Sequence, residues 1–518
     1  MKEKRLTLTR MIVPVLALAS MLLIMATRPC QAQTPTQKPK YGGVLKMITL
    51  GGPAVLGDPT KIRPGIHLTT LYPAIERLVS QDKNGQPTPL LATDWVWAPD
   101  GKSVTLSLRK GVKFHDGTDF NAEAVKWNLE RSKAARKPGL RLVTSMEIVD
   151  PYAIRLNLSR FDSTFLSGLS SFEGMMISPT AIKEKGEEWA IRNPVGTGPF
   201  KFVSYKRDVS QKYEKFDGYW DKGKPYLDGI EFVYIADPLV ASASFQAGEG
   251  HVLSLVSPKE GLNLVKKGYN VLSIPFGVGA NLAPDSTNPD SPYADKRVRE
   301  ALQYAIDTTA LAEALGYGFW EPKISQIIPS RSFAYDPNYK GRAYNPDKAK
   351  QLLLQAGYPE GFKTTLFVPP IYRNAWVAIQ GYLNKVGINT EIEICDRGRL
   401  NSYRFKGWKN GLVWAGIGGG SNTTAILPSY ISKNSIFWVS MSRPEGLQPL
   451  IAQALSARDF DTQVALTQKV LRMVADDAML LPLMADARLY FLHKGVHDAG
   501  LAEVDAFLWN PAGTWINQ

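Results

Sequence analysis

The stretch that decides the fold of this chain covers residues 88–131 and reads TPLLATDWVWAPDGKSVTLSLRKGVKFHDGTDFNAEAVKWNLER. Trp95 and Trp97 stand two residues apart, so they share one face of an extended segment. Residues 99–101, Pro-Asp-Gly, have the composition of a tight turn. Apolar and polar side chains then alternate over residues 103–109, as in a half-buried strand. The first half of the stretch therefore predicts two strands joined by a turn.

The second half of the stretch predicts another turn and a helix. His115, Asp116 and Gly117 form the turn sequence. Asn121 follows as a predicted N-cap for a helix that runs through Trp127 and beyond.

The N-terminus predicts export. Basic residues precede an uncharged apolar run over residues 11–26, which is shorter than the about 20 residues that a membrane span needs. Small residues at Cys30 and Ala32 predict cleavage before Gln33, so residues 1–32 are expected to be a signal peptide and residues 33–40 a flexible leader. The alternative is a lipid-bearing Cys30, which the preceding Arg-Pro pair disfavours. We expect an exported, periplasmic protein.

Composition limits the remaining choices. After the signal peptide, Cys395 is the one cysteine, so the fold has no internal disulfide and depends on its core. About 485 residues are too many for one domain and predict two or three lobes. The formal charge of the whole chain is +13, and 56 basic and 47 acidic residues after position 32 leave +9. These basic residues are spread thinly, which predicts a solvated surface and no nucleic-acid partner.

Strand-like and helix-like segments alternate along the rest of the chain, which predicts mixed α/β lobes. The expected strands and hairpins lie at residues 41–47, 148–158, 231–235 and 388–394, and residues 194–202 are expected to be a glycine-rich turn that runs into a strand. The expected helices lie at residues 242–247, 294–307, 345–356, 375–386, 452–455 and 462–475.

Five sequence blocks, taken in order, resemble the family 5 extracytoplasmic solute-binding proteins, which are receptors of ABC importers for peptides, nickel and oligosaccharides. The blocks are 88–131, NPVGTGPF at 193–200, the D-x-R-V-R-x-A-L-x-x-A-I-D pattern at 295–307, YNPDKAKQLLLQAGY at 344–358, and NKVGI at 384–388 paired with 476–483. The resemblance implies a two-lobed periplasmic-binding-protein clamp of α/β class with an extra inserted third lobe. It also implies a monomer and a cognate permease in the inner membrane.

The resemblance further implies the following division of the chain. Lobe I would combine residues 41–80, 195–285 and 485–518. Lobe II would be inserted at 81–194, and lobe III would cover 286–484. Lobes I and III would close on the solute like a hinged clamp.

An enzyme is not expected, because no G-x-S-x-G, P-loop or Rossmann motif is present. His493 and His497 have a spacing of four, but no neighbouring Cys or Glu completes a metal site, so we expect neither a metal nor a cofactor. His115 is expected to be structural, and Cys395 to be a small buried side chain.

The expected solute contacts follow from the resemblance. In peptide-binding relatives, a Trp is followed a few residues later by an Asp that pairs with the peptide's ammonium group. Here Trp414 is present and that Asp is not, so Glu173 or Asp396 is a candidate replacement. The candidate ligand-binding residues are Trp414, Gly416, Gly418, His67, Thr69, Tyr372, Arg373 and Trp376. The predicted ligand is a peptide or peptide-like solute, and the alternative is an oligosaccharide or other non-peptide organic solute.

Overall fold

The structure is a computed structural model that describes residues 38–62, 66–254, 257–275, 279–417, 422–501 and 508–517. Tyr41–Gln518 forms one compact unit, separate from Met1–Lys40. The predicted signal peptide, including Cys30, lies outside the described residues. Within these ranges, no helix combines the length and the apolar composition that crossing a bilayer requires.

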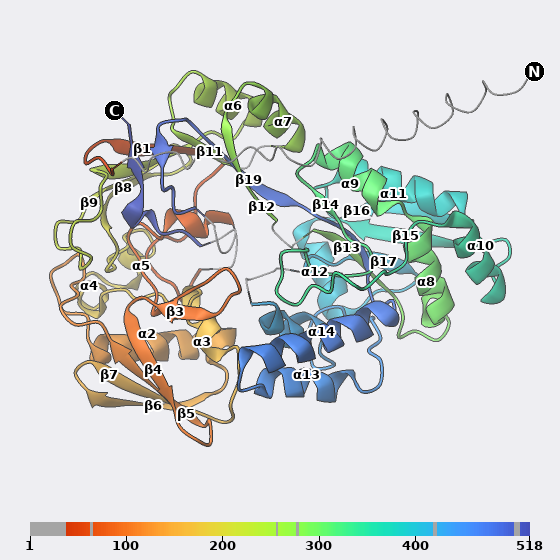
Figure 1. The fold of residues 1–518 in the computed structure, drawn as a ribbon, viewed down its shortest axis with the longest axis horizontal. Coiled ribbons are helices and arrows are strands. Elements are labelled where there is room, and N and C mark those ends of the chain that lie inside the picture. Colours follow the sequence, from red (N-terminus) through yellow and green to blue (C-terminus); the bar gives the residue numbers. More distant parts are fainter. Residues whose placement is uncertain are drawn as a thin grey trace, which may run out of the picture. The chain divides into compact units, whose positions relative to one another are not determined.

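A seven-stranded sheet joins segments from the beginning, middle and end of the chain (Figure 1). Its order is β12-β19-β11-β1-β10-β9-β8. The bounds are β1 Val44–Thr49, β8 Phe200–Lys206, β9 Ser210–Lys215, β10 Gly229–Tyr234, β11 Val252–Ser254, β12 Asn270–Pro275 and β19 Ala487–Leu492. Strand β1 pairs in parallel with both β10 and β11, which places the predicted early strand at the centre of the sheet.

Residues 88–131 fold as predicted, with their two strands in a four-stranded antiparallel sheet of order β4-β5-β7-β6. The bounds are β4 Ala92–Trp97, β5 Ser103–Leu108, β6 Val143–Asp150 and β7 Ala153–Leu158. Helix α2 (Ala122–Ala134) follows, and the Asn121 side chain accepts a hydrogen bond from Ala124 N at 3.0 Å, which confirms the predicted N-cap.

A six-stranded sheet of order β14-β18-β13-β17-β15-β16 forms the third core. Its strands are β13 Ala280–Pro284, β14 Glu321–Pro322, β15 Phe362–Val368, β16 Ile388–Ile394, β17 Gly411–Trp414 and β18 Leu481–Ala485. Helices α8, α10 and α11 contribute Leu302, Leu353 and Ile379 to the core that packs on this sheet.

The three sheets draw on the segments assigned to lobes I, II and III, with one correction. The prediction gave residues 280–284 to lobe I, whereas β13 pairs with β17 and β18 of the six-stranded sheet. All five side chains of β13 are buried, so this strand belongs to the interior of that sheet. The other lobe boundaries stay a prediction.

Besides α2, the helices α6, α8, α10, α11, α13 and α14 lie at predicted positions, with ends that differ by up to five residues, whereas α3, α4, α5, α7, α9 and α12 were not predicted. Their bounds are α3 Phe165–Gly168, α4 Pro179–Lys185, α5 Glu187–Ala190, α6 Pro238–Gln246, α7 Pro258–Lys266, α8 Lys296–Ala305, α9 Thr308–Gly316, α10 Pro346–Gln355, α11 Arg373–Lys385, α12 Arg397–Lys406, α13 Leu447–Ser456 and α14 Phe460–Asp476. Short pairs β2 Val79–Gln81 with β3 Pro87–Pro89, and β20 Val496–His497 with β21 Trp515–Ile516, complete the strands.

Two of the family-like blocks meet at a single turn. The His115 backbone N–H donates to Gly196 O at 2.9 Å, and its buried imidazole Nε2 donates to Gly198 O at 2.9 Å. From the other side, Thr197 Oγ1 donates to Glu76 Oε2 at 2.8 Å. A Cβ on Gly196 would lie 2.1 Å from Ala74 O, so only glycine fits this close backbone approach. His115 is therefore structural, as predicted.

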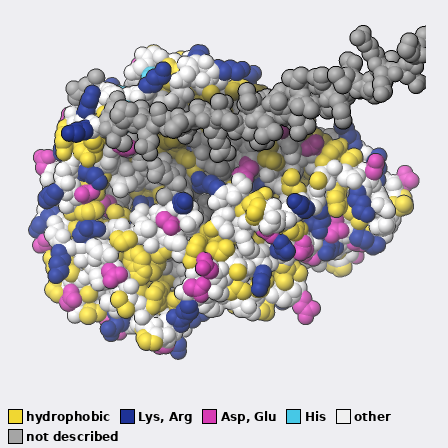
Figure 2. Space-filling view, in the orientation of Figure 1, with side chains coloured by type: hydrophobic (Ala, Val, Ile, Leu, Met, Phe, Trp, Pro, Cys, Tyr) yellow, Lys and Arg dark blue, Asp and Glu magenta, His cyan; other side chains and the backbone are white. Residues whose placement is uncertain are grey.

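Charged side chains of both signs are mixed on the visible part of one face of the molecule (Figure 2). On the face shown in Figure 2, Lys and Arg side chains are interspersed with Asp and Glu, which agrees with the predicted solvated basic surface.

Cys395 is buried, and burial beside Glu393 raises the pKa of its thiol to about 12, so it behaves as an apolar side chain.

Candidate functional site

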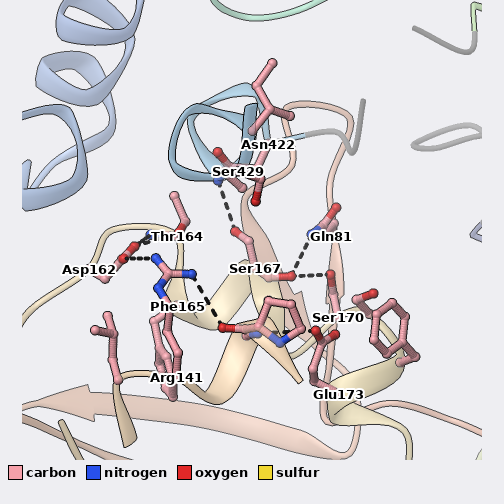
Figure 3. Close-up of a pocket in the computed structure, with 18 of the residues that line it drawn as sticks. Gln81, Arg141, Asp162, Thr164, Phe165, Ser167, Ser170, Glu173, Asn422 and Ser429 are labelled. Atoms are coloured by element: carbon pink, nitrogen blue, oxygen red, sulfur yellow. Dashed lines mark hydrogen bonds and ion pairs between the residues drawn. The ribbon is translucent and has the colours of Figure 1, made fainter. Parts of the chain in front are cut away.

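The candidate site is a cavity of about 340 Å³ in which segments from distant parts of the chain meet. Its walls come mainly from residues 138–142, 162–173 and 422–430, with Leu68, Tyr72, Gln81 and Leu508 closing the remaining sides. The first two segments lie next to the four-stranded sheet, and the third follows β17 of the six-stranded sheet. We call this space the candidate cavity (Figure 3). Its volume is in the range of small-molecule sites.

One basic side chain, Arg141, lines the candidate cavity beside a fully partnered carboxylate. Its Nη2 donates to Asp162 Oδ2 at 3.3 Å, and its Nη1 donates to Pro138 O at 3.4 Å. The other Asp162 oxygen accepts from the backbone and the hydroxyl of Thr164 at 2.9 and 2.6 Å. Asp162 is therefore held in place and is 2 % exposed, whereas the Arg141 side chain is 44 % exposed.

A second carboxylate, Glu173, lines the same cavity. Its Oε1 accepts one hydrogen bond from Gly139 N at 3.3 Å. Burial raises the pKa of this carboxyl, while its own backbone N–H, the Gly139 N–H, the charge of Lys137 and the Ser171 hydroxyl act in the opposite direction. The residue is 5 % exposed, so its charge lies in a poorly solvated environment.

Polar groups from opposite walls meet at Ser167. Asn422 Nδ2 donates to Ser167 Oγ at 3.1 Å, and Ser167 Oγ donates to Gly85 O at 2.9 Å. Gln81 Nε2 donates to Ser167 O at 3.0 Å, as Figure 3 shows. This network fixes the distance between the wall at 162–173 and the wall that begins at Asn422.

The predicted site residues at the end of β17 lie close to this wall. Trp414 is half-buried, and its indole Nε1 has no hydrogen-bond partner among the described residues. A Cβ on Gly416 would lie 2.6 Å from the Trp414 ring, so glycine is needed for the ring to lie against the backbone there. Gly418 lies outside the described residues.

The other predicted residues fall into two groups. His67 belongs to the short helix Ile66–Thr70, of which Thr69 is buried and lies 3.4 Å from Arg488 Nη2. The second group, Tyr372 and Arg373, lies at the start of α11. Tyr372 donates a hydrogen bond to Asp486, and the adjacent Arg373 is exposed.

The structure corrects the prediction that Trp376 lines a cleft, because this side chain is fully buried. Its indole Nε1 donates to Pro369 O at 3.0 Å and to Ile371 O at 2.8 Å. Trp376 therefore packs the start of α11 against the Pro-Pro segment before it. Among the described residues that line the candidate cavity, none is in the predicted set, although Leu68 is a neighbour of Thr69.

Sequence reasoning missed Arg141 and Ser167, because no motif or periodicity marks them. Glu173 was named as a possible replacement for the absent Asp, and it does line the candidate cavity. Asp396, the other replacement, caps α12 by accepting from Arg399 N at 2.8 Å and is absent from the described lining.

The histidine pair offers no metal site. His493 Nε2 lies 3.0 Å from Phe245 O, and His497 Nε2 lies 3.1 Å from Asn517 Nδ2. In the described ranges, no group of three or more His, Cys, Asp or Glu side chains has the arrangement of a metal site. The described lining of the candidate cavity also contains no His or Cys, so its groups are suited to hydrogen bonding and charge pairing.

A family model and a curated relative both match this chain over most of its length. The model of the bacterial extracellular solute-binding proteins, family 5 middle, matches residues 86–436, which is more than half of the chain. The glutathione-binding protein GsiB of Shigella flexneri serotype 5b (strain 8401) is 32 % identical over 428 residues, covering 79 % of this chain and 82 % of GsiB.

Solved structures show the same fold. The periplasmic binding protein DppA of Helicobacter pylori, in complex with the peptide STSA, superposes with a TM-score of 0.74 at 25 % identity, covering 92 % of this chain and 99 % of DppA. An ABC transporter substrate-binding protein of Sinorhizobium meliloti has a TM-score of 0.74 at 26 % identity, covering 92 % of this chain and all of that protein. The fold is thus the α/β periplasmic-binding-protein fold, as predicted. The chain belongs to the family 5 bacterial extracellular solute-binding proteins, the non-enzymatic substrate-binding components of ABC importers.

Proposed function

We propose that this receptor captures a peptide or peptide-like solute and delivers it to a cognate ABC permease in the inner membrane. The observation that carries the proposal is the presence of a basic side chain, Arg141, and an acidic side chain, Glu173, in the lining of one cavity. A peptide presents both charges together with amide groups, so it complements both side chains and the polar network at Ser167. The names of GsiB, a glutathione-binding protein, and of DppA with a bound peptide support the same ligand class.

Aromatic side chains supply the apolar part of the recognition. Phe165, Phe172 and Tyr430 line the candidate cavity, and the Tyr430 ring stacks on Phe437 with centroids 5.4 Å apart. Such rings suit the side chains of a peptide. They also suit a sugar face, which keeps an oligosaccharide as the competing ligand.

The receptor is proposed to act in the periplasm as a monomer, with the predicted lobes I and III closing over the solute. Closure adds contacts that the open form lacks, so the ligand shifts the equilibrium by its difference in affinity for the two forms. The permease would then recognise the closed form. Trp414, Gly416, Gly418, His67, Thr69, Tyr372 and Arg373 stay proposed ligand contacts in this scheme.

Native mass spectrometry of the mature protein, purified without denaturant, tests the ligand class. We expect adduct masses of short peptides, or a peptide-induced rise of several degrees in melting temperature when a dipeptide and tripeptide mixture is added. Adducts of sugar mass, with melting raised by oligosaccharides and not by peptides, would replace the peptide proposal by its competitor.

A further inference from the structure

One segment departs from the thin spread of basic residues along the rest of the chain. Residues 397–444 contain no Asp or Glu, although the chain has 48 of these among its 518 residues. The segment contains seven basic side chains, which are Arg397, Arg399, Arg404, Lys406, Lys409, Lys433 and Arg443. Its formal charge is therefore +7, more than half of the +13 of the whole chain. A local excess of this size attracts anionic partners where the fold gathers it on one surface.

The fold brings two parts of this segment together. Phe405, in the last turn of α12, packs against Phe437 with ring centroids 5.2 Å apart. Just beyond the helix, Ser440 Oγ accepts a hydrogen bond from Trp408 N and donates one to Trp408 O, each at 3.0 Å. Residues 405–409 therefore lie beside residues 437–440, and the two stretches form one continuous surface.

Large apolar side chains on this surface are exposed to solvent. Phe405 is 43 % exposed, Ile436 66 % and Val439 40 %. Val439 is a neighbour of α12, because a Cβ on Gly407 would lie 3.5 Å from the Val439 Cγ2. Apolar side chains that cluster on a surface in this way mark interaction sites.

Three lysines accompany these apolar side chains. Lys406 directly follows Phe405, Lys409 lies three residues further on, and Lys433 lines the same surface hollow as Val439. All three lysines are exposed, and none forms an ion pair with a described residue. The hollow also contains Glu445, the first acidic residue after the segment. We call the following six residues the basic apolar patch: Phe405, Lys406, Lys409, Lys433, Ile436 and Val439.

Three other basic side chains of the segment are engaged within the fold. The Arg404 guanidinium lies 4.9 Å from the centre of the Phe437 ring, and Arg443 Nη2 donates to Phe437 O at 3.1 Å. Arg399 forms an ion pair with Glu393 at 2.7 Å. These contacts hold the rings and the backbone beneath the basic apolar patch, and the three lysines present its charge to the solvent.

The α12 part of the basic apolar patch lies at the opposite end of the six-stranded sheet from Trp414. Strand β15 pairs in parallel with both β16 and β17, so these three strands run in the same direction. Helix α12 follows the carboxyl end of β16 and returns the chain to the amino end of β17. Lys406 and Lys409 therefore precede the start of β17, whereas Trp414 is its last residue. A partner at this end leaves the predicted solute contact uncovered.

We propose that the basic apolar patch docks the receptor on the surface of a bilayer that contains anionic phospholipids. The lysine ammonium groups meet the phosphate groups, and the apolar side chains enter the boundary between headgroups and acyl chains. This boundary offers anionic groups and an apolar layer together, whereas an acidic protein surface would leave Ile436 against charged groups. The inference goes beyond the proposed function and is independent of the solute. Docking confines the receptor to the membrane surface, where a permease is met by diffusion in two dimensions.

Vesicle flotation of the protein without residues 1–32 tests the docking. The vesicles consist of phosphatidylcholine alone or of an equimolar mixture with phosphatidylglycerol. We expect binding to the mixed vesicles in about 0.1 M NaCl and at least tenfold weaker binding to pure phosphatidylcholine. Binding to the mixed vesicles should also fall at least tenfold in about 1 M NaCl, since the Debye length shrinks from about 10 Å to about 3 Å. A wild-type protein that does not bind the mixed vesicles overturns the proposal.

Two lysine variants test whether the charge acts at the basic apolar patch. Lys406→Gln/Lys409→Gln should bind the mixed vesicles about 25-fold more weakly, because one lysine near an anionic surface contributes roughly a factor of five. Lys183→Gln/Lys185→Gln, on α4, is the matched control, since it removes the same charge from exposed lysines elsewhere. It should bind within about threefold of the wild type. Equal losses in the two variants show attraction by the overall charge and overturn the assignment to the patch.

Two apolar variants distinguish a phospholipid surface from an acidic macromolecule. Phe405→Ser/Ile436→Ser should weaken binding at least tenfold at unchanged charge. Leu239→Ser/Val240→Ser, whose side chains are 73 % and 56 % exposed on α6, is the matched control and should bind like the wild type. If Phe405→Ser/Ile436→Ser also binds like the wild type, contact is by charge alone and the phospholipid surface is rejected.

Melting curves verify that each of the four variants is folded. The rise in melting temperature that peptides cause, which tests the proposed function, should be the same in all four variants as in the wild type. Failure of membrane docking and failure of peptide binding are therefore observed in separate measurements.

Discussion

Acid should destabilise this protein through one buried side chain, His115. Its imidazole donates from Nε2 to Gly198 O at 2.9 Å, and the ring packs edge-on against Phe216 with centroids 4.8 Å apart. Burial lowers the pKa of His115 from 6.5 to about 4, and the charge of Lys201 acts in the same direction. The Gly198 contact and the charge of Asp116 oppose this shift. The folded protein thus holds His115 neutral over a range in which the unfolded chain binds a proton.

The sign and the size of the effect follow from that shift. Below pH 6.5 the unfolded chain takes up a proton that the folded state refuses, so the stability contributed by neutral His115 is lost as the pH falls toward 4. Each pKa unit corresponds to about 1.4 kcal/mol, so the complete loss is about 3 kcal/mol, of which about 2 kcal/mol is gone by pH 5.

In the wild-type protein, the titration of Glu76 offsets the pH dependence of stability that His115 produces. Burial raises the pKa of Glu76 from 4.5 to about 7, so the contribution of Glu76 falls as the pH rises through the same range. The two slopes have opposite signs and similar sizes. A comparison with His115→Gln isolates the histidine, because the glutamine amide retains a donor for Gly198 O and does not titrate.

Urea unfolding, followed by tryptophan fluorescence between pH 7.5 and 5, measures the difference. The free energy of unfolding of the wild type should exceed that of His115→Gln at pH 7.5, and this advantage should shrink by about 2 kcal/mol at pH 5. Asn128→Leu, which lowers stability without changing a titrating group, should keep a constant difference from the wild type. An advantage over His115→Gln that does not change with pH would refute the account of a neutral buried imidazole.

Three further substitutions have predictable effects. Glu76→Gln should gain about 3 kcal/mol of unfolding free energy relative to the wild type between pH 4.5 and 7.5, measured by the same urea titrations, because it removes the buried titrating carboxyl. Asn128→Leu should cost about 2–4 kcal/mol at pH 7.5, since its amide satisfies both the N–H and the C=O of Ile177 at 3.2 and 2.9 Å; a loss below 1 kcal/mol would contradict this. Arg458→Ala should lower the unfolding free energy by about 0.5–1 kcal/mol, because its guanidinium lies 4.2 Å from the centre of the Phe161 ring and donates to Asp100 O at 3.1 Å. It should also speed exchange of the Ser163 amide, which donates to Leu455 O at 2.7 Å between the segments that hold Phe161 and Arg458. Arg207→Ala is the control for Arg458→Ala, and equal exchange rates in the two variants would contradict the role of Arg458.

The elements that sequence reasoning located best are those with local signals. Asn121 caps α2 as predicted, and Asn345 caps α10 at the predicted start of that helix, because a short acceptor side chain satisfies the free N–H groups of the first turn within three residues. The assignment of β13 to lobe I was wrong because it depends on contacts that are distant in the sequence. Its partners, β17 and β18, lie more than 120 residues further along the chain, and no local pattern reveals which sheet a buried strand joins.

The candidate cavity was less accessible to prediction for the same reason. Glu173 precedes a short apolar run, residues 175–177, that predicts packing, and only the fold brings it beside Gly139. For Trp376 the prediction of a ligand contact was wrong, since an aromatic side chain after a Pro-Pro segment is compatible with a cleft wall as well as with a core. In the structure the Trp376 indole donates to Pro369 O and Ile371 O, which holds the side chain in the core. No spacing rule predicts these two hydrogen bonds from the sequence.

The position of β19 in the seven-stranded sheet imposes an order on biosynthesis. This strand lies between β12 and β11, and pairs with both, although it is made more than 200 residues after them. Until Ala487–Leu492 leaves the ribosome, both neighbours have an open edge that invites pairing with other chains. The four-stranded sheet needs only residues 92–158 and has no such delay. A nascent chain that stalls at position 486 should therefore contain the strands of the four-stranded and six-stranded sheets but an incomplete, aggregation-prone seven-stranded sheet, because only β19 is missing from it.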